Sequence, residues 1–169
     1  MSSTAPTLGD NQHSAMFFWP TPDRPVIDRG DGIYLWDQDG NRYIDACSGP
    51  QTANIGHGNA RVREAMSAQA EKVSYAFRSH FLNEPAESLA REIVGLCPDG
   101  LDQVFFTSGG SEAVEACIKL ARQYALAIGE ATRYKVISRL PSYHGTTLGA
   151  LSLTGDPAGF SMFAPMMVN

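Results

Sequence analysis

From residue 84 onward, patterns typical of helices and of strands alternate, and this alternation limits the possible folds more than any other feature. Apolar residues recur at helical spacing in residues 84–96 and 111–128, while residues 103–107 and 134–138 are short apolar runs typical of strands. A further helix is expected after the second of these strands. Strands that alternate with helices favour a parallel sheet covered by helices, so we predict an α/β fold.

The first 75 residues have a different organisation. Residues 33–45 contain two β-prone runs on either side of Asp39-Gly40, a dipeptide typical of hairpin turns. Asn59 follows a glycine-rich turn and can cap a helix that runs to about Val73. We therefore expect three parts: a flexible N-terminus over residues 1–15, the N-terminal segment of a small domain over 16–75, and the beginning of a large domain over 76–169.

Composition and charge limit the partners of the chain. Thirteen basic against eighteen acidic residues give a formal net charge of −5, which disfavours nucleic acid as a partner. No apolar run approaches the roughly 18 residues of a membrane span, and the histidines have no metal-ligand spacing. Cys47, Cys97 and Cys117 have no CxxC spacing and are expected to be reduced and mostly buried. These features, with a start that lacks a signal-peptide pattern, favour a cytoplasmic protein without a bound metal.

The residues between the strand predicted over 103–107 and the helix predicted over 111–128 could bind a phosphate. Ser108-Gly109-Gly110-Ser111 would stand at a helix N-terminus, where free N–H groups and the helix dipole favour an anion. The alternative is a serine-capped helix after a tight turn. The patterns GxxxxGK[ST] and GxGxxG are absent here, which argues against ATP, GTP and NAD.

A second candidate feature is the loop that contains Tyr143-His144-Gly145, just after the second predicted strand. Loops at the carboxyl ends of parallel strands meet in one ligand crevice. A tyrosine there could stack on a flat heterocycle whose phosphate is held by the residues described above. Alternatively, Tyr143 is an ordinary half-buried aromatic side chain and His144 a structural histidine.

Taken together, several motifs resemble one family. QVFFTSGGSEAVEACIKLAR and SYHGTTLGALSLTG are similar to the class III, ω-transaminase-type aminotransferases, which have fold type I and use pyridoxal 5′-phosphate. GDGIYLWDQDGNRYIDACSG, NIGHGN and FLNEPAESLAREI precede them in the family's order. The resemblance runs from about Phe17 to the end of the chain. It implies transfer of an amino group from an amine or amino acid to a keto acid or aldehyde, in an enzyme that forms a homodimer.

The resemblance also implies roles for particular residues. Gly109, Gly110 and Ser111 would bind the cofactor phosphate, with Ser108 adjacent. Tyr143 would stack on the pyridine ring, and His144 and Gly145 would shape the same wall. The residues expected near the substrate entrance are Ser48, Gly49, Phe77 and Arg78. A surface role for Arg78 is the alternative, and Pro50 departs from the aromatic residue that many amine-accepting members carry there.

The lysine that forms a Schiff base with this cofactor and the carboxylate beside its pyridinium nitrogen lie on family motifs beyond residue 169. Lys72, Lys119 and Lys135 do not suit the lysine's role; Lys119, for example, lies about 12 Å along the helix from Ser111. We therefore expect an N-terminal part, under half, of a transaminase, with no catalytic residue of its own and inactive alone. The alternatives are a non-catalytic or regulatory subunit of the same fold, and an aminomutase or decarboxylase of the same family.

Overall fold

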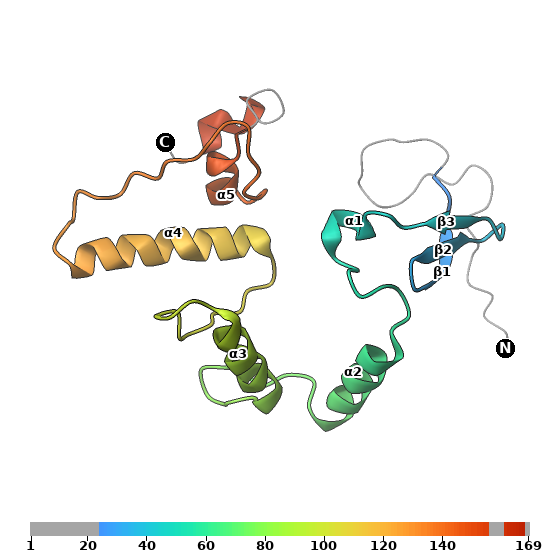
Figure 1. The fold of residues 1–169 in the computed structure, drawn as a ribbon. Helices are drawn as coiled ribbons and strands as arrows, with labels where there is room; N and C mark the ends of the chain where they lie inside the picture. The colour runs from blue at the N-terminus through green and yellow to red at the C-terminus, as the bar shows by residue number, and fades with distance from the viewer. Residues whose placement is uncertain (1–23, 156–160, 168–169) are drawn as a thin grey trace, which may run out of the picture. The chain divides into compact units, whose positions relative to one another are not determined.

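The computed structural model describes residues 24–155 and 161–167, so the predicted flexible N-terminus lies outside the described residues (Figure 1). The chain divides into two compact units, Met1–Phe81 and Leu82–Asn169. The predicted division into domains stays a prediction. None of the described helices has the length and apolar character needed to cross a membrane.

The first unit contains a three-stranded antiparallel sheet in the order β1-β2-β3. Its strands are β1 (Ile27–Asp31), β2 (Tyr34–Asp37) and β3 (Arg42–Ile44). The predicted hairpin is confirmed as β2 and β3, and Gly40 in their turn has a φ of 84°, which favours glycine. Strand β1 was not predicted, because its sequence IDRGD has no apolar alternation.

The hairpin turn is organised by Asp37, which is almost fully buried. Its carboxylate accepts hydrogen bonds from Tyr43 Oη at 2.6 Å, Asn41 N at 2.8 Å and Asn41 Nδ2 at 3.0 Å. The bonds from Tyr43 and then Asn41 lower the pKa of Asp37, and the same contact raises the pKa of Tyr43. A charged group at this turn is therefore satisfied inside the unit.

Two helical segments follow the sheet. The short α1 (Ser48–Gln51) is distorted, with non-helical angles at Gly49 and Pro50. In contrast, α2 (Ala60–Lys72) is regular and begins at Asn59, whose side chain accepts a hydrogen bond from Val62 N at 3.3 Å. The predicted Asn59-capped helix is thus confirmed.

The second unit consists of helices joined by coil (Figure 1). Helix α3 (Glu84–Leu96) has the predicted bounds and is capped by the Asn83 side chain. Helix α4 (Gly110–Ala127) begins one residue before the prediction and is followed by Gly129 with a φ of 82°. The expected further helix is α5 (Leu148–Leu153), and a 3₁₀ helix, η1, covers Ser161–Met166.

The two strands predicted in this unit are absent: residues 103–107 and 134–138 form coil. A strand exists only through hydrogen bonds to a neighbour, and neither segment has a strand partner among the described residues. Their apolar side chains are exposed, with 64% of Phe105 and 95% of Ile137 accessible. The local β pattern is real, but the pairing that would make it a sheet is not formed.

Little apolar surface is buried in the described residues. The buried apolar side chains are Ala125, Ala150 and Leu151, which belong to α4 and α5. The expectation that the cysteines are mostly buried is wrong, since Cys47 and Cys117 are exposed. Burial needs a second layer of structure, and most helix faces here have none within their unit. The best-packed part of the second unit is therefore the contact between α4 and α5.

Candidate functional site

The predicted cofactor residues of the second unit lie together at the first turn of α4. Thr146 N donates a hydrogen bond of 3.0 Å to Ser111 Oγ, across 35 positions of sequence. Gly145, with a φ of 136°, lies so close that an added Cβ would be 2.5 Å from Ser111 Oγ and 2.8 Å from Ala150 Cβ. The loop that contains Tyr143, His144 and Gly145 therefore packs directly on the helix end, and only glycine fits at position 145.

The N-terminus of α4 presents polar groups to open space. Gly109 is the N-cap residue, and the first i→i−4 bond of the helix runs from Ala113 N to Gly109 O at 3.0 Å. The amides of Gly110, Ser111 and Glu112 precede that bond, as expected for a first turn. A Cβ at Gly109 or Gly110 would meet no atom within 4 Å. The space beside the two glycines is thus open, and the helix dipole favours an anion at this end.

The predicted role of Ser108 is qualified by Glu112. Ser108 N donates a hydrogen bond of 2.8 Å to Glu112 Oε2, so the amide of Ser108 already has an acceptor inside the protein. Ser111 differs, because its hydroxyl accepts from Thr146 N and a serine hydroxyl can still donate its own hydrogen. Ser111, which is predicted from the sequence as a phosphate ligand, therefore has a side-chain hydroxyl that can donate to a ligand.

Thr154 orders the loop and was missed in the sequence. Its hydroxyl accepts from His144 N at 3.0 Å and donates to Gly145 O at 3.1 Å. Nearby, Ser142 Oγ donates to Arg139 O at 2.6 Å. The backbone of the loop is held on both sides, while 70% of the Tyr143 side chain is accessible. Thr154 is the C-cap of α5, and its position directly after that helix is the local signal that could have found it.

These residues fit the phosphate and ring of the expected cofactor. A phosphate dianion needs several N–H or O–H donors, and the first turn of α4 supplies amides, an available hydroxyl and no steric obstruction. Tyr143 offers an accessible aromatic face on the same loop that contacts Ser111. The roles of all seven cofactor residues stay predictions.

The residues predicted near the substrate entrance lie in the first unit. Ser48 and Gly49 are in the distorted α1, and the carboxylate of Asp45, three residues before Ser48, accepts from Ser48 N at 2.8 Å. Phe77 makes an edge-to-face contact with His80, at a centroid distance of 5.2 Å, and Arg78 follows it in the coil before α3. Their role at a substrate entrance stays a prediction.

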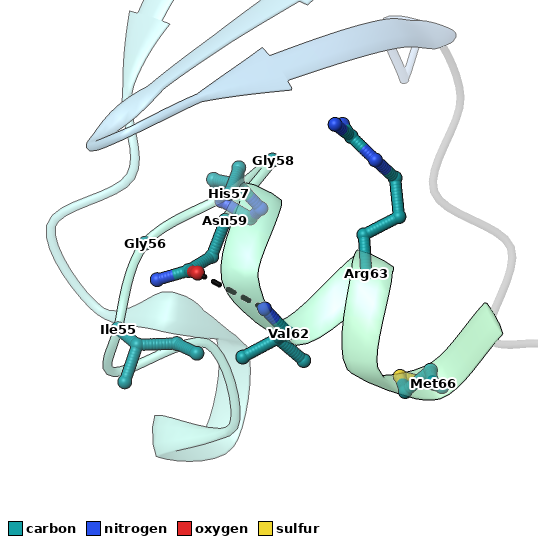
Figure 2. Close-up of a pocket in the computed structure, with 8 residues that line it drawn as sticks. All are labelled: Ile55, Gly56, His57, Gly58, Asn59, Val62, Arg63 and Met66. Atoms are coloured by element: carbon teal, nitrogen blue, oxygen red, sulfur yellow. Dashed lines mark hydrogen bonds between the residues drawn. The ribbon is translucent and has the colours of Figure 1, made fainter. Parts of the chain in front are cut away.

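An open cavity in the first unit does not coincide with the predicted site. It has a volume of about 420 Å³ and lies against the start of α2 (Figure 2). The lining residues are Ile55, Gly56, His57, Gly58, Asn59, Val62, Arg63 and Met66. None of them is a predicted cofactor or substrate residue. Its polar lining residues include His57 and Asn59, whose side chains already bond within the unit, and Arg63.

The three lysines lie in different segments of the chain, and the sequence does not favour any of them as the Schiff-base lysine. Lys119 lies in the middle of α4, about 12 Å along the axis from Ser111. Lys135 is in the coil over residues 134–138, and Lys72 ends α2 in the first unit. Within the second unit, Lys119 is therefore away from the open end of α4.

Comparison with solved structures first defines the class of protein. The chain superposes on adenosylmethionine-8-amino-7-oxononanoate aminotransferase from Methanocaldococcus jannaschii with a TM-score of 0.84 at 34% identity, over 90% of this chain and 37% of that one. It also matches a transaminase from the marine bacterium Virgibacillus, with a TM-score of 0.78 at 40% identity, over 83% and 32% of the two chains. The fold is accordingly that of part of a fold type I transaminase.

The sequence then defines the family. The family model described as aminotransferase class-III matches residues 20–169, and the chain belongs to this family. A probable aminotransferase of Mycobacterium tuberculosis is 44% identical over 142 residues, which are 84% of this chain and 30% of that protein. The acetylornithine aminotransferase of Clostridium acetobutylicum is 40% identical over 143 residues, 84% and 36% of the two chains. The chain thus spans about a third of the length of these curated relatives, and the predicted resemblance is confirmed.

Proposed function

We propose that the protein is a pyridoxal 5′-phosphate-dependent aminotransferase, which transfers an amino group from an amine or amino acid to a keto acid or aldehyde. The single observation that carries the proposal is the bond from Thr146 N to Ser111 Oγ. It joins the anion-favouring end of α4 to the loop with the accessible Tyr143 ring. A ligand that has both a phosphate and a flat ring matches this pair of features, and family membership supports the same cofactor.

In this proposal the chain binds and orients the cofactor. The first-turn amides of α4 and the Ser111 hydroxyl hold the phosphate, and Tyr143 packs against the ring. The cofactor, when bound, supplies an electron sink that stabilises negative charge at the carbon bearing the amino group. Ser48, Gly49, Phe77 and Arg78 contribute to the substrate entrance. The protein acts as a homodimer in the cytoplasm.

The proposal is tested by cofactor binding to a Ser111→Ala variant. Loss of one hydrogen bond to a charged group costs ~1.5–3 kcal/mol, so the affinity for pyridoxal 5′-phosphate should fall roughly tenfold to hundredfold. The matched control is Ser88→Ala on the exposed face of α3, which should bind as the unchanged protein does. Binding is followed by the absorbance of the cofactor in equilibrium dialysis. Equal affinity in the Ser111→Ala and Ser88→Ala variants would contradict the proposed phosphate site.

The reaction type is tested separately. In an enzyme that contains this chain and also supplies the Schiff-base lysine, we expect a 2-oxo acid to be converted to its amino acid at the expense of an amine or amino acid donor, measured by chromatography of both products. Residues 1–169 alone should transfer no amino group. Cofactor binding without amino transfer in that enzyme would instead favour the non-catalytic subunit. Release of carbon dioxide from the substrate would favour the decarboxylase. Movement of the amino group to another carbon of the same molecule would favour the aminomutase.

A further inference from the structure

Asp45 joins three parts of the first unit through one carboxylate. It directly follows β3, and Asp45 N donates to Ile33 O at 2.9 Å. Its Oδ2 lies 2.8 Å from His57 Nε2, and its Oδ1 accepts from Ser48 N at 2.8 Å. The side chains of Asp45 and His57 are only 12% and 26% exposed. Both oxygens of the carboxylate are thus used, one toward His57 and one toward the start of α1.

His57 is itself held rigidly by the turn between β1 and β2. Its backbone exchanges two hydrogen bonds with Gly32, His57 N to Gly32 O at 2.8 Å and Gly32 N to His57 O at 3.1 Å. An added Cβ at Gly30 would lie 2.7 Å from His57 Cβ, so the histidine packs against bare backbone there. Because the imidazole is fixed on one side, its bond to Asp45 also fixes the carboxylate.

The segment that Asp45 holds is conformationally unfavourable. Ser48 and Gln51 have φ values of 53° and 62°, in the left-handed region that L residues seldom adopt, and Gly49 between them has 63°. Such backbone angles persist only where surrounding contacts hold them. In the described residues, the Asp45 carboxylate is the side chain that bonds the Ser48 amide.

We propose that Asp45, oriented by His57, is a positioning residue that holds the Ser48–Gly49 turn in the shape required at the substrate entrance. We call the two bonds from His57 to Asp45 and from Ser48 N to Asp45 the clamp. The catalytic consequence of the clamp rests on the proposed function, whereas the clamp itself does not. Its predicted effect is on amino-donor binding, because the turn does not belong to the phosphate-binding residues of α4. The bond from His57, followed by that from Ser48 N, lowers the pKa of Asp45, as expected for a carboxylate held in its charged form.

The clamp is tested first by hydrogen exchange, which needs neither cofactor nor substrate. In the Asp45→Ala variant, the exchange rate of the Ser48 amide should rise at least about tenfold, because its charged acceptor is lost. Asp45→Asn keeps an oxygen toward Ser48 and should restore much of the protection. His57→Gln, which can still donate to Asp45, should also keep most of it. Asp28→Ala removes an exposed carboxylate of β1 and serves as the matched control.

The catalytic consequence is measured in the same variants. In an enzyme that contains this chain and also supplies the Schiff-base lysine, we expect Asp45→Ala to raise KM for the amino donor about tenfold while the affinity for pyridoxal 5′-phosphate is unchanged, with partial rescue by Asp45→Asn. Unchanged Ser48 exchange in Asp45→Ala would overturn the clamp. Faster exchange with an unchanged KM would overturn its role at the entrance. If the unchanged protein binds no cofactor, the proposed function fails, while the exchange rates still decide whether Asp45 holds the turn.

Discussion

The Ser48–Gly49 turn of the first unit and the Ser111 turn of the second contain similar residues but differ in how their backbone N–H groups are bonded. At Ser48, a carboxylate from the same unit accepts the backbone N–H, so the donor is satisfied internally. At Ser111, the side chain accepts an N–H from a distant loop, and the amides of the first helical turn stay available. The first turn thus satisfies its donor internally, whereas the second keeps donors available, as the proposed phosphate site requires.

The largest effect is expected from a Gly145→Ala substitution, which should separate the loop from the Ser111 turn. The added Cβ would be 2.5 Å from Ser111 Oγ and 2.9 Å from Ser111 Cα, at a φ that disfavours any L side chain. The loop would have to leave the end of α4, at a cost of about 1–3 kcal/mol in the free energy of unfolding. We expect a lower midpoint of urea unfolding and loss of most cofactor affinity.

The matched control for that substitution is Gly95→Ala near the end of α3, where an added Cβ meets no atom within 4 Å. Alanine is favoured over glycine in a helix by about 0.5–1 kcal/mol, so this variant should be slightly more stable. Equal midpoints for the two variants would mean that the loop is not packed on α4 in solution.

A smaller effect is expected from substitutions of Tyr143, which lies on the loop that packs on the Ser111 turn. If the ring stacks on the cofactor, Tyr143→Ala should lower cofactor affinity roughly two- to tenfold, in line with ~0.5–1.5 kcal/mol for an aromatic contact. Tyr143→Phe should keep most of the affinity. Because 70% of the side chain is accessible, neither change should alter the unfolding midpoint. Equal loss in both variants would assign the effect to the hydroxyl group instead.

The smallest effect is an acid response confined to the first unit. The carboxyl groups with a lowered pKa among the described residues are Asp37 and Asp45, both in that unit. A lowered folded-state pKa contributes stability above the unfolded value of about 3.9, and this contribution is lost as pH falls through the folded value. The fluorescence of Trp36 in β2 should therefore report loosening below about pH 4. Tyr43→Phe, which removes a bond to Asp37, should weaken that pH dependence, whereas an identical acid transition would contradict it.

The helices were predictable because their signals are local. Asn59 and Asn83 directly precede their helices and each accepts a hydrogen bond from the amide three residues on, and Pro85 stands in the first turn of α3. The strands over residues 103–107 and 134–138 were wrong for the opposite reason, since a strand depends on a partner that the local sequence does not contain. The hairpin succeeded because both of its strands lie within a dozen residues of the same turn.

The candidate sites follow the same rule. Ser111 and Gly145 could be singled out because each belongs to a short motif, Ser108–Ser111 or Tyr143–Gly145, that directly follows a β-prone run or lies in the loop after one. Asp45 and His57 could not, since the contact that gives them a role joins residues that are distant in the sequence. Asp45 and His57 stand 12 positions apart, on either side of the distorted α1, and no spacing rule connects such a pair.

The bond between Thr146 and Ser111 has a consequence for how a ligand and the loop influence each other. The Ser111 oxygen accepts from the loop while its hydrogen is free to donate, so the hydroxyl is a relay between the two. Donation to an anion increases the electron density on the oxygen and strengthens the bond it accepts. Anion binding would then tighten the loop, and by thermodynamic linkage any change that tightens the loop would raise anion affinity by the same factor.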